Sequence, residues 1–245
     1  MGLAAAIRSR PLIFLFGLAA VSLLGLLLLP PIPQSQAYHR FADQRAIFGI
    51  PNFWDVISNL PFVLVGLAGM RIVRGDRSAF VFFLGVFLTG FGSAYYHWSP
   101  NDIGLFWDRL PMTFAFMAIL ANAIGERIDA RAGALLFWPL VALGVASLLV
   151  WLRYDDLRLY AWVQFFPCLA LPIMFALFPP KYTGTGYWFA AAGFYVLAKV
   201  LEYADAAIFA SGHLVSGHTL KHLAAAGACY ALLRAFQTRR PVPPI

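Results

Sequence analysis

Long apolar segments fill most of this chain of 245 residues and restrict its possible folds more than any other feature. A helix needs about 20 apolar residues to span a bilayer, because the hydrocarbon core is roughly 30 Å thick. Helices are expected because backbone groups in lipid need partners within their own segment, and the alternating pattern of barrel strands is absent. The apolar segments lie at residues 11–30, 54–72, 79–97, 109–125, 133–152, 159–178, 185–203 and 216–236.

Charged side chains are scarce, at 12% of the chain, whereas 61% of the residues are hydrophobic. A soluble domain carries about 25% charged residues. The polar surface is therefore too small to cover a water-soluble globule. The sequence predicts an all-α fold, a polytopic membrane helix bundle with a seven-helix core and one extra N-terminal span. The net charge of +7 fits an excess of Lys and Arg in cytoplasmic loops, and no nucleic-acid partner is expected.

The basic residues are distributed unequally between the two sides of the predicted bundle. With the N-terminus inside, the inner segments carry eleven Lys and Arg residues and the outer segments carry five. The positive-inside rule then predicts eight spans with both termini in the cytoplasm.

The first apolar segment has two interpretations. The letters "RSR", an apolar run and "SQA" ending at Ala37 resemble a secretory signal with a small-residue cleavage site. The apolar region of such a signal has about 7–15 residues, and this run is longer. We therefore expect an N-terminal anchor helix within residues 1–37, followed by one membrane domain over residues 38–240.

Several polar side chains cluster at the predicted outer ends of the spans, where ionisable groups are costly and tend to be functional. His97 ends the third span, and Asp108 starts the fourth. His218 and His222 start the eighth span. Ser93 precedes His97 by one helical turn, so both side chains share a face.

The spacing of the histidines is typical of a metal site. His218 and His222 are four residues apart, which places both imidazoles on one helix face, as in H-E-x-x-H sites. His97 would supply a third nitrogen, and catalytic zinc prefers three protein ligands with one open position. Asp108 would then take a proton from the metal-activated water, and Ser93 would hydrogen-bond that water or a developing oxyanion. The C-terminal pair alone is also compatible with interface histidines, helix contacts or haem ligation.

Other polar residues have simpler expected roles. His39 and His213 lie on the same outer side but in loops, and we expect them to be solvated. Lys199 and Glu202 are three residues apart and predict a structural ion pair. Ser58 and Asn59 lie one turn into the second span, where Asn59 either bridges helices or shapes the site. The two cysteines lie in apolar spans and predict small buried side chains, without a disulfide or a thiolate metal site: Cys168 and Cys229.

The combined motifs resemble the alkaline ceramidases, part of a wider superfamily of seven-span metal-dependent hydrolases that includes the adiponectin-receptor type. The matching features are S-x-x-x-H at Ser93 and His97, Asp108 eleven residues later in "WDRLPM", and H-x-x-x-H near the C-terminus. The stretch "FWDVISNLPF" also resembles the first-span motif of that family. The resemblance covers roughly residues 43–236.

This resemblance implies a seven-helix bundle around a zinc ion held by His97, His218 and His222, with Ser93 and Asp108 beside the activated water. It implies cleavage of the amide bond of ceramide, or of a related N-acyl membrane lipid, to an amine-bearing lipid and a fatty acid.

One departure concerns calcium. The eukaryotic members share an acidic calcium site before the first family span. Asp43 is present here, but Asn52 stands where an acidic residue is expected, which argues against a calcium site.

The alternative to an enzyme is a membrane receptor or transport protein with a structural metal site. Such a site is closed by four protein ligands, whereas a hydrolase keeps one position open.

Overall fold

The computed structural model describes residues 7–243, and within that range the chain is helical and forms no β-strand. The first six residues of the predicted anchor segment 1–37 lie outside the described residues. The helices are α2 (Pro11–Leu27), α3 (Phe53–Ile57), α4 (Leu60–Ile72), α5 (Arg77–Trp98), α6 (Asp102–Arg127), α7 (Ala130–Tyr154), α8 (Arg158–Leu177), α9 (Thr185–Tyr203), α10 (Asp205–Ala210) and α11 (Gly217–Thr238), with a 3-10 turn at Gln36–His39.

Each of the eight predicted apolar segments coincides with a long helix, and α3 and α4 together form the second. Five of these helices are long and apolar enough to cross a membrane, and they fit a multi-pass membrane protein: Phe53–Ile72, Arg77–Trp98, Asp102–Arg127, Ala130–Tyr154 and Arg158–Leu177. Helix α2 is apolar but has 17 residues. Helices α9 and α11 fall outside this group, and in α11 the first turns carry His218, Lys221 and His222.

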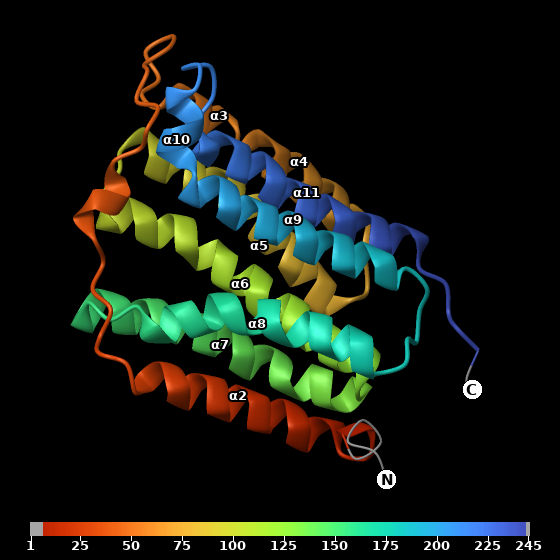
Figure 1. Cartoon of the computed structure of the whole chain (residues 1–245). Helices are drawn as coiled ribbons and strands as arrows, with labels where there is room; N and C mark the ends of the chain where they lie inside the picture. Colours follow the sequence, from red (N-terminus) through yellow and green to blue (C-terminus); the bar gives the residue numbers. More distant parts are fainter. Residues whose placement is uncertain (1–6, 244–245) are drawn as a thin grey trace.

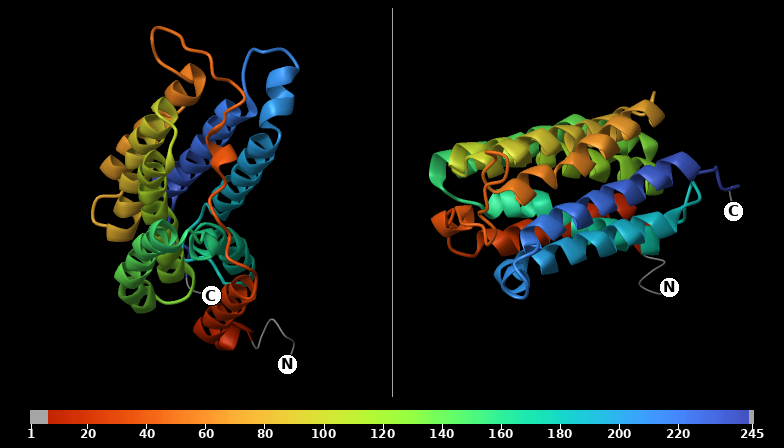
Figure 2. Two further views of the ribbon diagram at one scale, coloured as in Figure 1. Left: turned by 90° about the vertical axis from the view of Figure 1, so that its left-hand side faces the viewer. Right: turned by 90° about the horizontal axis from the view of Figure 1, so that it is seen from above.

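The seven helical segments after α2 pack into a closed bundle (Figures 1 and 2). Helix α11 packs against both α9 and α4, so the last helix closes the bundle against the first family span. Helix α5 packs against α4 and α6, and α6 also contacts α7 and α8. Helix α2 lies at the outside against α8. This order places the start of α11 beside α3 and the end of α5, where the predicted site residues lie.

The start of α6 differs from the prediction. The apolar pattern placed Asp108 at the beginning of a span, but α6 begins at Asp102, so Asp108 and Arg109 lie inside the helix. The N-cap is Asn101, whose side chain accepts a hydrogen bond from the backbone N–H of Gly104 at 2.8 Å. An N-cap can begin a helix ahead of its continuous apolar stretch. Hydropathy alone located the start too late, because Asp102, Gly104 and Asp108 interrupt the apolar residues there.

Glycine permits the closest contact between α5 and α6 near the predicted site. A Cβ atom on Gly92 would lie 2.2 Å from the carbonyl oxygen of Trp107, so the two backbones meet at this position. Ser93 follows Gly92 and Asp108 follows Trp107. The close contact therefore holds these two polar residues next to each other.

Candidate metal and hydrolase site

Three buried histidines from two distant segments meet at one end of the bundle. His97 lies next to the last residue of α5, whereas His218 and His222 occupy the first two turns of α11. The Nε2 atoms of His97 and His218 are 3.3 Å apart, and each of the three residues offers one ring nitrogen within 4.8 Å of the others. Among the described residues, these three histidines are the one group of three or more His, Cys, Asp or Glu side chains placed closely enough to hold a metal ion.

The spacing of the imidazoles fits zinc. Zinc binds histidine nitrogen at about 2.0–2.1 Å, so two ligands of a tetrahedral ion lie roughly 3.3 Å apart. His97 and His218 have this separation without an ion. A set of three nitrogen ligands with a fourth position open is also the arrangement typical of catalytic zinc. The predicted ligand set is therefore brought together, and its chemistry suits zinc.

His222 is held in place by a hydroxyl group behind its ring. Ser58 Oγ lies 2.8 Å from His222 Nδ1, and the same hydroxyl is 3.2 Å from the carbonyl oxygen of Asp55. A partner on one ring nitrogen fixes the orientation of the other, as is usual for histidine ligands of metals. Of the two polar residues considered in the second span, Ser58 contacts the site. Asn59 donates to the Asp55 carbonyl at 2.7 Å instead.

Two acidic residues that the sequence analysis did not consider anchor the first turn of α11. The carboxylate of Asp55 accepts hydrogen bonds from Thr219 Oγ1 at 2.6 Å and Ser216 Oγ at 3.3 Å. Asp205 accepts from the backbone N–H of His218 at 2.8 Å. A carboxylate inside an apolar stretch, as Asp55 is in "FWDVISNLPF", is the signal that could have identified the first of them.

An aromatic side chain covers the histidines on the side of the N-terminal segment. The ring of Phe41 lies 4.6 Å from His97 and 4.9 Å from His218, measured between centroids. His97 also packs against Tyr96, and its Nδ1 atom is buried without a hydrogen-bond partner. Packing therefore sets the orientation of the His97 ring, and Phe41 covers His97 and His218 on one side.

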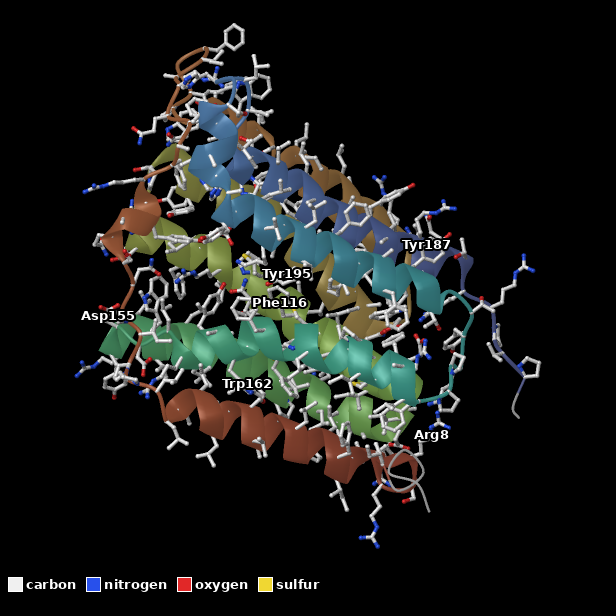
Figure 3. The ribbon with its side chains drawn as sticks, viewed as in Figure 1. Arg8, Phe116, Asp155, Trp162, Tyr187 and Tyr195 are labelled. Carbon is white, nitrogen blue, oxygen red and sulfur yellow. The ribbon has the colours of Figure 1, made fainter. Side chains whose placement is uncertain are left out.

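Ser93 and Asp108 line a cavity of about 440 Å³ that also reaches His222. The Ser93 side chain lies close enough to the Asp108 carboxylate to interact with it. Farther from the histidines, the wall is mostly apolar and includes Phe116 of α6 and Tyr195 of α9, whose rings meet edge to face at 5.9 Å. Figure 3 shows these two rings between the ribbons. Gln164 of α8 donates to the Tyr195 hydroxyl at 3.0 Å, which links α8 and α9 across this wall.

A group of charges lies near the same end of the cavity. The predicted ion pair between Lys199 and Glu202 is confirmed. Lys221, for which the sequence pattern predicts no role, also binds Glu202 at 2.7 Å, and the Tyr38 hydroxyl donates to that carboxylate at 3.3 Å. Glu202 therefore neutralises part of the charge of two lysines.

The candidates for calcium have other partners. Both carboxylate oxygens of Asp43 accept hydrogen bonds from the Arg45 guanidinium, at 2.8 and 2.6 Å. Burial raises the pKa of Asp43, but the hydrogen bonds from Arg45 outweigh it, and the net shift is downward. Asn52 donates to the backbone carbonyl of His97 at 2.8 Å. Asn52 thus supports the end of α5, and Asp43 is paired with Arg45.

The remaining histidines divide into one confirmed and one incorrect prediction. His213 is exposed in a loop, as expected. His39 is not solvated, because its ring bonds the Tyr96 hydroxyl at 2.9 Å and Asp102 at 3.0 Å. Both cysteines are free and partly buried.

Comparison with known proteins identifies one family. The model of the family described as Ceramidase matches residues 47–180. A search of curated proteins found no match. The matched region contains Ser93, His97 and Asp108 but ends before α11. The two C-terminal histidines are connected to the family site by the geometry of the bundle.

Proposed function

The chain belongs to the ceramidase family, and we propose that it cleaves ceramide or a related N-acyl lipid with a zinc ion held by His97, His218 and His222. Members of this family are hydrolases of the ceramide amide bond, so this protein is an amide hydrolase. The observation that carries the zinc proposal is the convergence of three buried imidazoles from α5 and α11 with a zinc-like separation.

In the proposed reaction, Asp108 transfers protons and Ser93 contacts the oxyanion. A zinc ion in such a site acts as a Lewis acid and lowers the pKa of water. Asp108 takes a proton from the attacking water and delivers it to the nitrogen of the leaving amine. Ser93 donates a hydrogen bond to the oxygen of the tetrahedral centre. Their contact with each other and their place on the cavity wall beside His222 support these roles.

The apolar part of the cavity suits the acyl chain. Both His222 and Leu232 of α11 line the cavity, and ten residues of helix rise about 15 Å. A saturated chain along this wall stays out of water, as it does in the bilayer, and its return to water would cost about 0.8 kcal/mol per methylene group. The polar groups are concentrated at the histidine end, so the amide would lie there.

The second candidate is a receptor or transport protein with a structural metal site. A structural zinc site is closed by four protein ligands, whereas the group of described residues here has three members. Together with the adjoining cavity, this supports a hydrolase.

We also propose the placement of the chain in the membrane. The distribution of Lys and Arg supports both termini in the cytoplasm and the site near the opposite face. Residues 1–37 would serve as an anchor segment, packed through α2 against α8, and residues 38–240 would form the hydrolase domain.

The test combines metal analysis with a lipid panel. We expect purified protein to contain about one zinc per chain and to release fatty acid and free amine in equal amounts from ceramides or other N-acyl lipids. Chelation should abolish hydrolysis, and added zinc should restore it. Hydrolysis that persists after complete metal removal would contradict the zinc proposal. Firmly bound zinc without hydrolysis of any N-acyl lipid would favour the receptor or transport alternative.

A further inference from the structure

Arg109 is a buried cation in the wall of the cavity, next to Asp108 in the chain. Arg109 belongs to α6, and the residue is 7% exposed. Its guanidinium lies over the rings of Trp151 and Tyr160, at 4.7 Å from each centroid, and of Tyr38 at 5.6 Å. These three rings come from different segments and hold the guanidinium in one position.

This guanidinium has no oxygen partner in the described part of the chain. Its Nη1 atom is buried without a hydrogen bond, and none of the ion pairs of the described residues includes Arg109. A buried charge that lacks hydrogen bonds is costly, and aromatic faces do not accept N–H groups as oxygen atoms do. The aromatic rings stabilise the Arg109 guanidinium in the free protein, but its N–H groups have no oxygen acceptor among the described residues.

The other cations at this end of the cavity are already paired. Lys199 and Lys221 both bind Glu202. Among the described residues of this cavity wall, Arg109 is therefore the cation that remains able to bind an oxygen-bearing group of a ligand. A guanidinium presents a planar fork of N–H donors that matches hydroxyl pairs, carboxylates and phosphates.

We propose that Arg109 is a substrate-binding residue that donates hydrogen bonds to oxygen atoms on the amine-bearing half of the N-acyl lipid. This inference rests on the proposed function. The acyl half has no oxygen beyond its carbonyl, and the apolar end of the cavity is suited to it. The shared chemistry is an oxygen acceptor near the amide nitrogen, supplied by the hydroxyls of a sphingoid base or by an anionic group on another amine. Arg109 thus selects against amides of plain alkylamines.

The test compares three amides with the same palmitoyl chain: N-palmitoylsphingosine, N-palmitoylglycine and N-palmitoyl-octadecylamine. For the oxygen-bearing substrates that the wild type cleaves, we expect Arg109→Gln to lower kcat/KM by about 10- to 100-fold, typical of a lost hydrogen bond to a charged group. For the octadecylamide the expected loss is under about threefold. A larger loss on N-palmitoylsphingosine identifies hydroxyls as the partner, and a larger loss on N-palmitoylglycine identifies a carboxylate.

A merely structural role for Arg109 would lower kcat/KM for all three amides equally, and that result would overturn the proposal. Arg109→Lys keeps a cation among the rings but lacks the fork, so it gives the same substrate-dependent pattern if the Gln variant does not fold. Arg153→Gln is the control, because Arg153 lies over the ring of Tyr154 but is exposed.

Binding of the same lipids, measured by thermal shift in detergent, separates the two proposals. If the wild type hydrolyses none of the amides, the proposed function fails. Weaker binding of the oxygen-bearing lipids alone by the Arg109 variants still supports this inference, and equally weakened or unchanged binding of all three overturns it.

Discussion

The ring nitrogens of His97 and His218 face each other at 3.3 Å, although the residues are 121 positions apart in the sequence. Neither α5 nor α11 could form this contact alone. The contact depends on the position of α11 between α9 and α4, and on the anchoring of its first turn by Asp55 and Asp205. The behaviour of the site should therefore reflect both helices.

Each of the substitutions His97→Ala, His218→Ala and His222→Ala should remove bound zinc and abolish hydrolysis, because three ligands act on one ion. A double substitution should be scarcely worse than either single one, since groups that act as a unit are not additive. Metal content per mole of folded protein and hydrolysis of ceramide check this. His213→Asn is the matched control, because His213 is exposed and its φ of 52° suits asparagine. A full equivalent of zinc in His97→Ala would contradict the three-histidine site.

Replacing Asp108 by Asn should leave zinc content unchanged and lower kcat by roughly 10²–10⁴-fold, the usual contribution of a general acid–base group. Asp108 lies beside Ser93 on the cavity wall, and the amide of Asn cannot accept the proton. Asp102→Asn is the control on the same helix, since Asp102 binds His39 instead. Near-normal turnover in Asp108→Asn would remove this residue from the mechanism.

Removing the hydroxyl of Ser58 should weaken the site without removing a ligand. In Ser58→Ala the Nδ1 atom of His222 loses its partner at 2.8 Å. Loss of such a supporting contact typically costs 10- to 100-fold in metal affinity or activity. Competition with a zinc chelator measures the change. Ser147→Ala serves as the control, because the Ser147 hydroxyl bonds only within α7, to the Gly144 carbonyl. Equal zinc affinity in both variants would argue against a role for Ser58.

The substitution Gly92→Ala should separate α5 from α6. Its new methyl group would lie 2.2 Å from the Trp107 carbonyl oxygen, so the helices must move. Overpacking of this kind costs about 1–3 kcal/mol. We expect a lower Tm in detergent and reduced hydrolysis, since Asp108 would shift relative to Ser93. Gly186→Ala, with nothing within 4 Å of the new Cβ atom, should change neither. An unchanged Tm in Gly92→Ala would show that this contact is unimportant.

The proposed orientation predicts where fused reporters will lie. A reporter near residue 102 or 210 should be on the non-cytoplasmic side, and one after residue 238 should be in the cytoplasm. Enzymatic reporters that are active on one side only make the measurement. A cytoplasmic signal from the reporter near residue 102 would place the histidines at the opposite membrane face.

The helical segments could be located from the sequence because their cause is local. An apolar run of membrane length has to satisfy its own backbone, and it does so as a helix wherever it lies. The same local reasoning placed His218 and His222 on one face, since four residues make about one helical turn. It misplaced the start of α6, because Asn101 caps a stretch in which Asp102, Gly104 and Asp108 interrupt the apolar residues, so the apolar pattern starts later.

The sequence by itself determined the membrane class, the order of the long helices, and the residue types able to bind a metal. Only the tertiary structure decided which partners these residues acquire. Ser58 meets His222, Asp55 meets Thr219, and the Arg109 guanidinium rests among aromatic rings from three segments. Such contacts depend on which faces of distant helices pack together and how closely, as at Gly92, where the absence of a side chain lets two backbones meet. Periodicity specifies the face of a helix, but the neighbour that covers that face is chosen by the packing of the whole bundle.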